Sequence, residues 1–287
     1  MKRLLPFLLF VCLTSFAGRG QLTLRRISIG LNAGGMNYLG DLNRQSMLGK
    51  LNMGYGATVR YLIDNRWSLR VDGAYGTVEG GNPDYIARRN LSFRSHIYEA
   101  SLRVEFNFLP FSTAERQYRW TPYIFGGVGM FHFNPTAQYT NGSGEVVEVA
   151  LQPLRTEGQG SNEYPDRQPY ALTAPMMPFG VGFRVKPNDM LTFGVEYGFR
   201  KTWTDYLDDV STTYVGSELL NRYHSDGEAA LLADRSGEVV EGYVNAVGIE
   251  RGDDSLDDWY AYLNAYVSFR LDKVFWFVGK KRCDMKH

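Results

Sequence analysis

The sequence predicts an all-β protein: an eight-stranded antiparallel up-and-down barrel that spans a membrane. Two observations predict this fold: eight segments alternate apolar with polar side chains, and the connections between them are alternately short and long. The clearest segment is Trp259–Leu271, in which every odd position is apolar and every even position can form hydrogen bonds. A strand of this length is unusual in a sandwich, but it suits a tilted strand with one face in lipid and the other in a polar lumen.

Four segments lie in the N-terminal part of the chain. Ile27–Tyr38 alternates imperfectly, and Asn52–Ile63 is rich in glycine but places Arg60 on its polar face. Arg66–Val78 and His96–Phe108 alternate more regularly, with apolar side chains on one face and charged ones on the other. Each pattern predicts a strand that is half exposed to lipid.

Four further segments follow. Pro122–Asn134 contains IFGGVGMF, which offers small or apolar residues on both faces. Met177–Lys186 and Met190–Arg200 alternate, with large apolar residues on one face and glycines or charges on the other. With Trp259–Leu271 they bring the strand count to eight, and an even count places both ends of the barrel on the same side of the membrane.

The connections indicate how the barrel is oriented. The short ones are Asp64-Asn65, Pro110–Trp120 and Pro187–Asp189. The long ones are Leu39–Leu51, Glu79–Phe93, Pro135–Ala171 and Thr204–Asp257. Short periplasmic turns and long extracellular loops are typical of OmpA-like outer-membrane barrels, so we expect both termini in the periplasm. We expect one barrel domain over 21–271 and a periplasmic tail over 272–287.

Composition agrees with a membrane barrel. The chain has 31 basic and 31 acidic residues, a balance that gives no sign of nucleic-acid binding. Its 19 Tyr, 17 Phe and 31 Gly suit interfacial aromatic belts and a crowded barrel wall. The alternative is a soluble β-sandwich, which would need a second sheet to cover the apolar face of His96–Phe108.

Residues 1–20 read as an export signal. Lys2 and Arg3 precede an apolar run, Leu4–Phe16, that is too short to span a membrane as a helix, and Gln21 is the expected mature N-terminus. Cys12 lies within that run without a small residue before it, so no lipid attachment is expected. No helix of about 20 apolar residues is predicted further along the chain.

The polar faces predict a network of charges inside the barrel. Eight strands enclose a bore just wide enough for side chains, and buried charges persist only when they are paired. We therefore expect a closed lumen rather than a diffusion pore. The predicted lumen charges are Arg60, Arg70, Asp72, Glu99, Arg103, Glu105, Arg184, Glu196, Arg200 and Arg270.

Candidate catalytic and metal-binding residues are few. Some eight-stranded barrels are esterases, but His96, His132 and His224 assemble no Ser-His-acid triad of plausible spacing, so no enzyme, catalytic residue or cofactor is predicted. Two acidic clusters flank one long loop and offer a low-probability calcium site. Its residues are Asp205, Asp208, Asp209, Asp253 and Asp254.

The mature chain keeps a single cysteine, Cys283, in a basic tail after the last strand. In the oxidising periplasm an odd cysteine suggests pairing with another chain, and an unpaired thiol on a frayed tail is the alternative. The residues alone leave both open.

Several phrases resemble a family of Bacteroidetes outer-membrane barrels that includes the PorG component of the type IX secretion system. They are NYLGDL (Asn37–Leu42), NLSFRSHIYEASLRVEFNF (Asn90–Phe108), TPYIFGGVG (Thr121–Gly129), FNP (Phe133–Pro135), LQPLRTEGQG (Leu151–Gly160), RKTWTDYLDDVSTTY (Arg200–Tyr214), LADRS (Leu232–Ser236), Arg251-Gly252 and DWY (Asp258–Tyr260). They occur in order over nearly the whole mature chain. The ending CDMKH departs from the short proline-containing ending of many members.

This resemblance implies a structural role in protein secretion. Such a barrel contacts outer-membrane lipids and anchors a periplasmic ring that contains a lipoprotein, and Cys283 becomes a candidate for a disulfide to that lipoprotein. The alternative function is a stand-alone outer-membrane barrel whose long extracellular loops bind a ligand or a host molecule.

Overall fold

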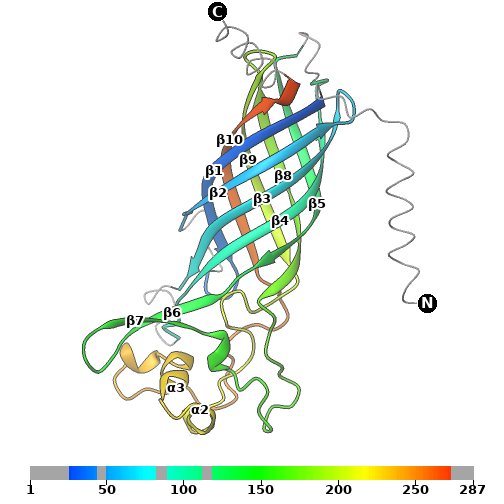
Figure 1. Cartoon of the computed structure of the whole chain (residues 1–287). Helices are drawn as coiled ribbons and strands as arrows, with labels where there is room; N and C mark the ends of the chain where they lie inside the picture. The colour runs from blue at the N-terminus through cyan, green and yellow to red at the C-terminus, as the bar shows by residue number, and fades with distance from the viewer. Residues whose placement is uncertain (1–25, 44–49, 82–88, 112–117, 273–287) are drawn as a thin grey trace, which may run out of the picture.

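The computed structural model describes residues 26–43, 50–81, 89–111 and 118–272. Within them, eight strands form one closed antiparallel barrel in the order β3-β2-β1-β10-β9-β8-β5-β4, with β4 pairing back to β3 (Figure 1). The predicted fold class is confirmed, and strand bounds differ from those predicted by no more than four residues. The barrel strands are β1 (Ile27–Leu39), β2 (Asn52–Leu62), β3 (Trp67–Gly80), β4 (Phe93–Asn107), β5 (Trp120–His132), β8 (Thr173–Val185), β9 (Leu191–Thr202) and β10 (Trp259–Arg270).

The barrel has two unlike ends. We call the end with the connections 63–66, 108–119 and 186–190 the turn end, and the opposite end the cap end. The register of β1 against β10 pairs Ser28 with Arg270, so the described chain starts and finishes at the turn end (Figure 1).

The outer wall of the barrel is apolar. Leu31, Val128 and Val181 are each more than half exposed, and the residues immediately before and after each of them are less exposed. Aromatic rings gather towards both ends of this wall, for example Trp67 against Phe106 at the turn end and Tyr75 against Tyr98 towards the cap end. An apolar band between aromatic belts is the outer surface of a barrel that spans a membrane.

The two longest connections are not open loops but fold into a cap, which comprises residues 133–172 and 203–258. Part of it is a hairpin that extends beyond the barrel wall (Figure 1). The hairpin continues the sheet of the barrel, because Thr136 pairs with Arg94 of β4. The elements of the cap are β6 (Pro135–Thr140), β7 (Val146–Ala150), η2 (Gln152–Leu154), α2 (Ser217–Tyr223), α3 (Glu228–Ala233) and η3 (Ser236–Glu238). The sequence did not predict these elements.

The cap is packed onto the barrel. One continuous hydrophobic core runs from Met36, Ile97 and Phe131 inside the cap end to Leu207 and Leu220 in the cap. The cap therefore closes that end of the bore with side chains. No helix in the described ranges is both long and apolar enough to cross a membrane.

Candidate functional site

A row of arginines crosses the inner wall of the barrel. The register places Arg60 of β2 directly opposite Arg70 of β3, and Arg70 directly opposite Arg103 of β4. All three are buried. Like charges directly opposite each other destabilise a sheet, and buried charges need partners. The carboxylates of the lumen therefore decide whether this wall is stable.

Glu105 is the carboxylate that holds most of the row together, and it is fully buried. Arg60 donates to it through Nε at 2.8 Å, and Arg184 donates through Nη2 at 2.7 Å. Nη1 of Arg70 lies 2.8 Å from its Oε1. A single carboxylate thus serves three guanidinium groups from three strands.

Glu196 and Asp72 complete the partners of Arg70. Glu196, on the opposite wall in β9, accepts from both terminal nitrogens of Arg70, with Nη2 3.0 Å from Oε2, and it also accepts from the hydroxyl of Tyr123. Asp72 accepts from Nε of Arg70 at 2.8 Å and lies 3.4 Å from Nε of Arg103. Because β3 and β9 are separated by three strands, the Arg70–Glu196 pair spans the bore.

Glu99 forms the layer nearest the cap end. It accepts from Nη2 of Arg103 at 3.0 Å, from Nε of Arg200 at 3.1 Å and from the hydroxyl of Tyr260 at 2.8 Å. Charge-assisted bonds of this kind are about twice as strong as neutral ones. The fully buried Glu99 therefore has all its main acceptor directions occupied.

The structure brings nine of the ten predicted lumen residues into one connected network of ion pairs, and Arg270 lies apart from these pairs. Its Nε is 2.6 Å from Asp272 at the mouth of the turn end. The connected residues are Arg60, Arg70, Asp72, Glu99, Arg103, Glu105, Arg184, Glu196 and Arg200.

Glycines on the inner wall make room for the aromatic members of this network. A Cβ at Gly182 would overlap the ring of Tyr123, and one at Gly194 would overlap the ring of Tyr266. The two rings therefore lie close against the wall, and the Tyr123 hydroxyl reaches both Tyr266, at 3.2 Å, and Glu196. This packing explains why Gly182 of β8 and Gly194 of β9 stand at these two inward positions.

A second polar cluster lies where the cap meets the barrel. The hydroxyl oxygen of Tyr38 is 2.6 Å from Oδ2 of Asp208 in the cap and 2.6 Å from Oδ1 of Asp258 before β10. A tyrosine hydroxyl has one hydrogen to donate. One of the two carboxyl groups must therefore carry a proton and donate to the tyrosine oxygen. All three side chains are buried.

The surroundings favour this protonated state. Burial raises the pKa of both Asp208 and Asp258 well above the usual range, and the charge of Asp208 raises the pKa of Asp258 further. Burial also raises the pKa of the neighbouring Asp205 to about 8. Since like charges held together cannot all ionise, the cluster retains protons near neutral pH.

We predict that the cap is held more tightly at pH 5 than at pH 9. Carboxyls with raised pKa in the folded state bind more protons than in the unfolded state between about pH 4 and pH 8, so the free energy of unfolding falls as pH rises through that window. Proteinase K digestion of the cap at several pH values checks this. Asp208→Asn keeps a donor to Tyr38 and is expected to flatten the profile; an unchanged profile contradicts the prediction.

Glu157 organises the interior of the cap. It is fully buried and accepts from Nη1 of Arg251 at 2.9 Å, from the backbone N–H groups of Ser211 and Thr212 at 2.9 and 3.0 Å, and from the Thr212 hydroxyl at 2.6 Å. Nε of Arg251 also donates to the carbonyl of Ala233 at 3.1 Å. This pair joins two loops that lie 94 residues apart in sequence.

The low-probability calcium residues are not gathered into one site. Asp209 accepts from Thr156 and Tyr170 and lies 3.6 Å from Arg251, while Asp253 accepts from Ser255. Asp208 bonds to Tyr38 and Asp254 is exposed. Across the residues that the structure describes, no three His, Cys, Asp or Glu side chains are arranged to hold a metal ion.

The structure also places the three histidines of interest. His96 stacks on Tyr75, with ring centroids 5.9 Å apart, and His132 bonds to Thr173 at 3.1 Å; both are exposed. His224 follows the last residue of α2. Cys283, with the rest of the predicted tail after residue 272, and the predicted signal over 1–20 lie outside the described residues.

Sequence reasoning missed the residues that join the cap to the barrel. The pattern of the sequence does not mark Tyr38, Glu157, Arg251 or Asp258 as members of a site. Tyr260 lies on the predicted polar face of Trp259–Leu271, so its parity is a usable signal. For Glu157 the loop offers no periodicity.

Comparison with known proteins gives a family and a fold. A family model described as "Domain of unknown function (DUF6089)" matches residues 2–152, just over half of the chain. No curated protein matches.

Solved outer-membrane proteins are similar in structure at low sequence identity. Neisserial surface protein A is 10% identical with a TM-score of 0.41, over 85% of this chain and 96% of its own. Ail of Yersinia pestis, in complex with the heparin analogue sucrose octasulfate, is 9% identical with a TM-score of 0.39 over the same shares. OprG of Pseudomonas aeruginosa is 13% identical with a TM-score of 0.39, again over 85% and 96%.

Proposed function

The chain belongs to the family described as a domain of unknown function, DUF6089, and from this premise we propose that it is a structural outer-membrane component of the type IX secretion system. In this role it anchors a periplasmic, lipoprotein-containing ring to the outer membrane. The resemblance of phrases from Asn37 to Tyr260 to the PorG-containing barrel family supports the proposal. The closed interior supports it as well, since it suits an anchor better than a conduit.

The plugged lumen is the observation that carries a structural role. Nine interlinked charged side chains fill the bore, and the Arg70–Glu196 pair crosses it. The hydrophobic core shared by barrel and cap fills the cap end. A solute would have to break several buried ion pairs to pass, at a cost of several kcal/mol for each pair. Interactions with other molecules are therefore left to the two ends of the barrel.

We infer the orientation of the barrel in the membrane from its two unlike ends. Short connections and both described chain ends share the turn end, and the folded cap occupies the other. In outer-membrane barrels short turns are periplasmic and long connections extracellular. We place the turn end, with Arg26 and Asp272, in the periplasm, where it can contact a periplasmic ring.

A tag inserted in the turn between β6 and β7 tests this function. Residues Asn141–Glu145 form an exposed turn far from the turn end, so a tag after Gly142 leaves both termini free. From solubilised outer membranes we expect the tagged barrel to recover ring subunits, including a lipoprotein. On non-reducing gels a larger, reducible species should disappear in Cys283→Ser. Recovery of the barrel alone contradicts the anchor role; an unchanged Cys283→Ser pattern removes only the disulfide.

A second candidate is favoured by exposed apolar residues on the cap. Between α3 and β10, six aliphatic side chains are exposed to solvent. Exposed apolar patches on a protein surface often mark binding sites. The six residues are Val239, Val240, Val244, Val247, Ile249 and Leu256, with exposed fractions between 44% and 67%. They suit a stand-alone barrel whose extracellular cap binds a ligand or host molecule. This reading predicts recovery of the tagged barrel without ring subunits.

A further inference from the structure

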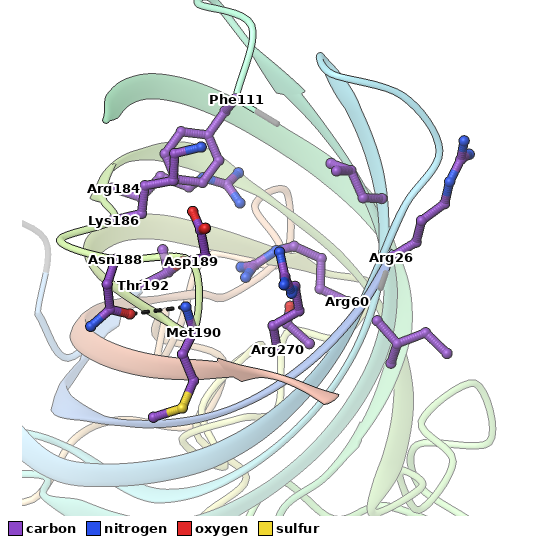
Figure 2. A pocket seen from close by; sticks show the side chains of 13 residues that line it. Arg26, Arg60, Phe111, Arg184, Lys186, Asn188, Asp189, Met190, Thr192 and Arg270 are labelled. Carbon is purple, nitrogen blue, oxygen red and sulfur yellow. Dashed lines mark hydrogen bonds between the residues drawn. The ribbon is translucent and has the colours of Figure 1, made fainter. Parts of the chain in front are cut away.

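The mouth of the barrel at the turn end contains a pocket that the ion-pair network does not fill. Residues of β1, β2, β8, β9 and β10 line it, together with residues of the β8–β9 connection (Figure 2). Five of its lining residues are cations and one is acidic. The cations are Arg26, Arg60, Arg184, Lys186 and Arg270, and the acid is Asp189.

Positive charge exceeds negative charge at this mouth. Arg60 and Arg184 both bond to Glu105, which Arg70 also contacts, so one carboxylate is shared by three guanidinium groups. Arg270 pairs with Asp272. Arg26 donates to the carbonyl of Ile63 and lies near Asp64. Among the described residues, five lining cations therefore face four carboxylates, namely Asp64, Glu105, Asp189 and Asp272. Charge of this kind attracts anions and orients them on approach.

Arg184 is fixed in place with a donor to spare. Its side chain is 2% exposed, and its guanidinium carbon lies 3.8 Å from the centre of the Tyr123 ring and 5.6 Å from that of Phe111. Its Nε is buried and has no hydrogen-bond partner within the part of the chain that the structure describes. A buried donor without an acceptor is unfavourable, so an oxygen ligand that bonds to this nitrogen removes that cost.

The pocket also has an apolar side. Ile27, Leu62, Phe111 and Met190 line it beside the cations. Cations next to apolar side chains match a carboxylate that is carried beside an apolar residue, which is the chemistry of an acidic peptide. The cations Arg60, Arg184 and Arg270 are buried and come from lumen-facing positions, so this part of the lining faces the interior of the barrel.

We propose that this mouth is a docking pocket for an acidic peptide segment, in which a carboxylate binds Arg184 and its cationic neighbours and an adjacent apolar side chain packs near Phe111. The identity of the partner rests on the proposed function: a periplasmic ring subunit would supply the segment. The binding of an acidic peptide to this pocket does not depend on the proposed function. Guanidinium forks bind carboxylates in a directional way, so the site selects acidic over neutral sequences.

The direct test uses the full-length protein in detergent micelles and a fluorescein-labelled peptide, acetyl-Glu-Phe-Glu-amide. We expect saturable binding by fluorescence anisotropy that weakens with salt and is absent for acetyl-Gln-Phe-Gln-amide. Arg26→Glu and Lys186→Glu are expected to weaken binding at least tenfold. The matched control is Lys201→Glu, which makes the same charge change on β9 near Trp259 at the cap end and should leave binding unchanged.

Folding of each variant is checked by the shift in gel mobility between heated and unheated samples, and exposed Arg26 provides a variant that leaves the buried network intact. Absent binding, or equal losses in Arg26→Glu and Lys201→Glu, overturns the proposal. Displacement of the peptide by an equal concentration of inorganic phosphate also overturns it, because the pocket would then be a general oxyanion site. The peptide assay needs no ring, so a failure of the anchor role in the purification experiment is distinguishable from a failure here.

Discussion

Glu105→Gln is expected to destabilise the barrel by about 3–5 kcal/mol, because it removes the one carboxylate that three buried arginines share. Glutamine keeps the shape and one acceptor oxygen but leaves Arg60, Arg70 and Arg184 without their common counter-charge. Arg70 and Arg103 keep Asp72, Glu99 and Glu196, but Arg60 and Arg184 lose the one carboxylate that pairs with each of them among the described residues. Urea unfolding in detergent micelles, followed by tryptophan fluorescence, measures the change.

The matched control for this change is Glu79→Gln. Glu79 pairs with Arg94 and Lys50 near the cap end of the barrel, where the Arg94 side chain is 51% exposed and that of Lys50 63% exposed. Exposed pairs contribute about 0–1 kcal/mol, so a small effect is expected there. The double variant Glu105→Gln, Arg184→Gln should recover part of the lost stability, since it removes one of the two arginines that Glu105→Gln leaves without a carboxylate partner. Equal effects of the two single variants would show that the lumen network does not stabilise the barrel.

Arg251→Met is expected to open the cap while the barrel stays folded. The substitution leaves Glu157 buried without its cation, and it removes the donor to the carbonyl of Ala233. Removing one partner of a buried pair costs about 3–5 kcal/mol, and here the cost falls on the cap, because both partners of the pair lie in it. Proteinase K followed by mass spectrometry should find new cleavage within 203–258.

The barrel provides the internal reference for this experiment. Its gel-mobility shift on heating should be unchanged in Arg251→Met, because no barrel strand contributes to the Arg251 pairs. Arg222→Met is the matched control: Arg222 bonds to Glu163 in the same cap, but the two side chains are 60% and 40% exposed. If Arg222→Met and Arg251→Met are cut equally, or neither is cut faster than the wild type, the assigned role of Arg251 is wrong.

The strands of the barrel were predictable because their signal is local. Alternation with period two in Trp259–Leu271 or His96–Phe108 states which residues face lipid and which face the lumen. The inward parity of Glu105 and Arg184 follows directly, and both are buried in the structure. The segment Pro122–Asn134 alternates imperfectly, but it was predicted as a strand because it completes a count of eight. It corresponds to β5 in the structure.

The partners within the lumen were not predictable from alternation. Arg60 meets Glu105 and Arg70 meets Glu196 because the strands are tilted and staggered, and the amount of stagger is a property of the closed barrel. No single segment carries that information. Arg270 and Arg200 are both predicted to face the lumen. For the same reason only the structure reveals that Arg270 pairs with Asp272 at the mouth, whereas Arg200 joins the network.

The sequence by itself determined the membrane barrel: its strand number, the face that each residue presents, and the shared side of its two ends all follow from local periodicity and connection lengths. Tertiary structure alone decided the cap and the pocket at the mouth. Glu157 and Arg251, and likewise Tyr38 and Asp208, are distant in sequence and lie in or beside segments without periodicity, so only the folded chain brings them together. The physical reason is that alternation reflects which solvent each face meets, whereas pairing of buried charges depends on the packing of all the strands and loops at once.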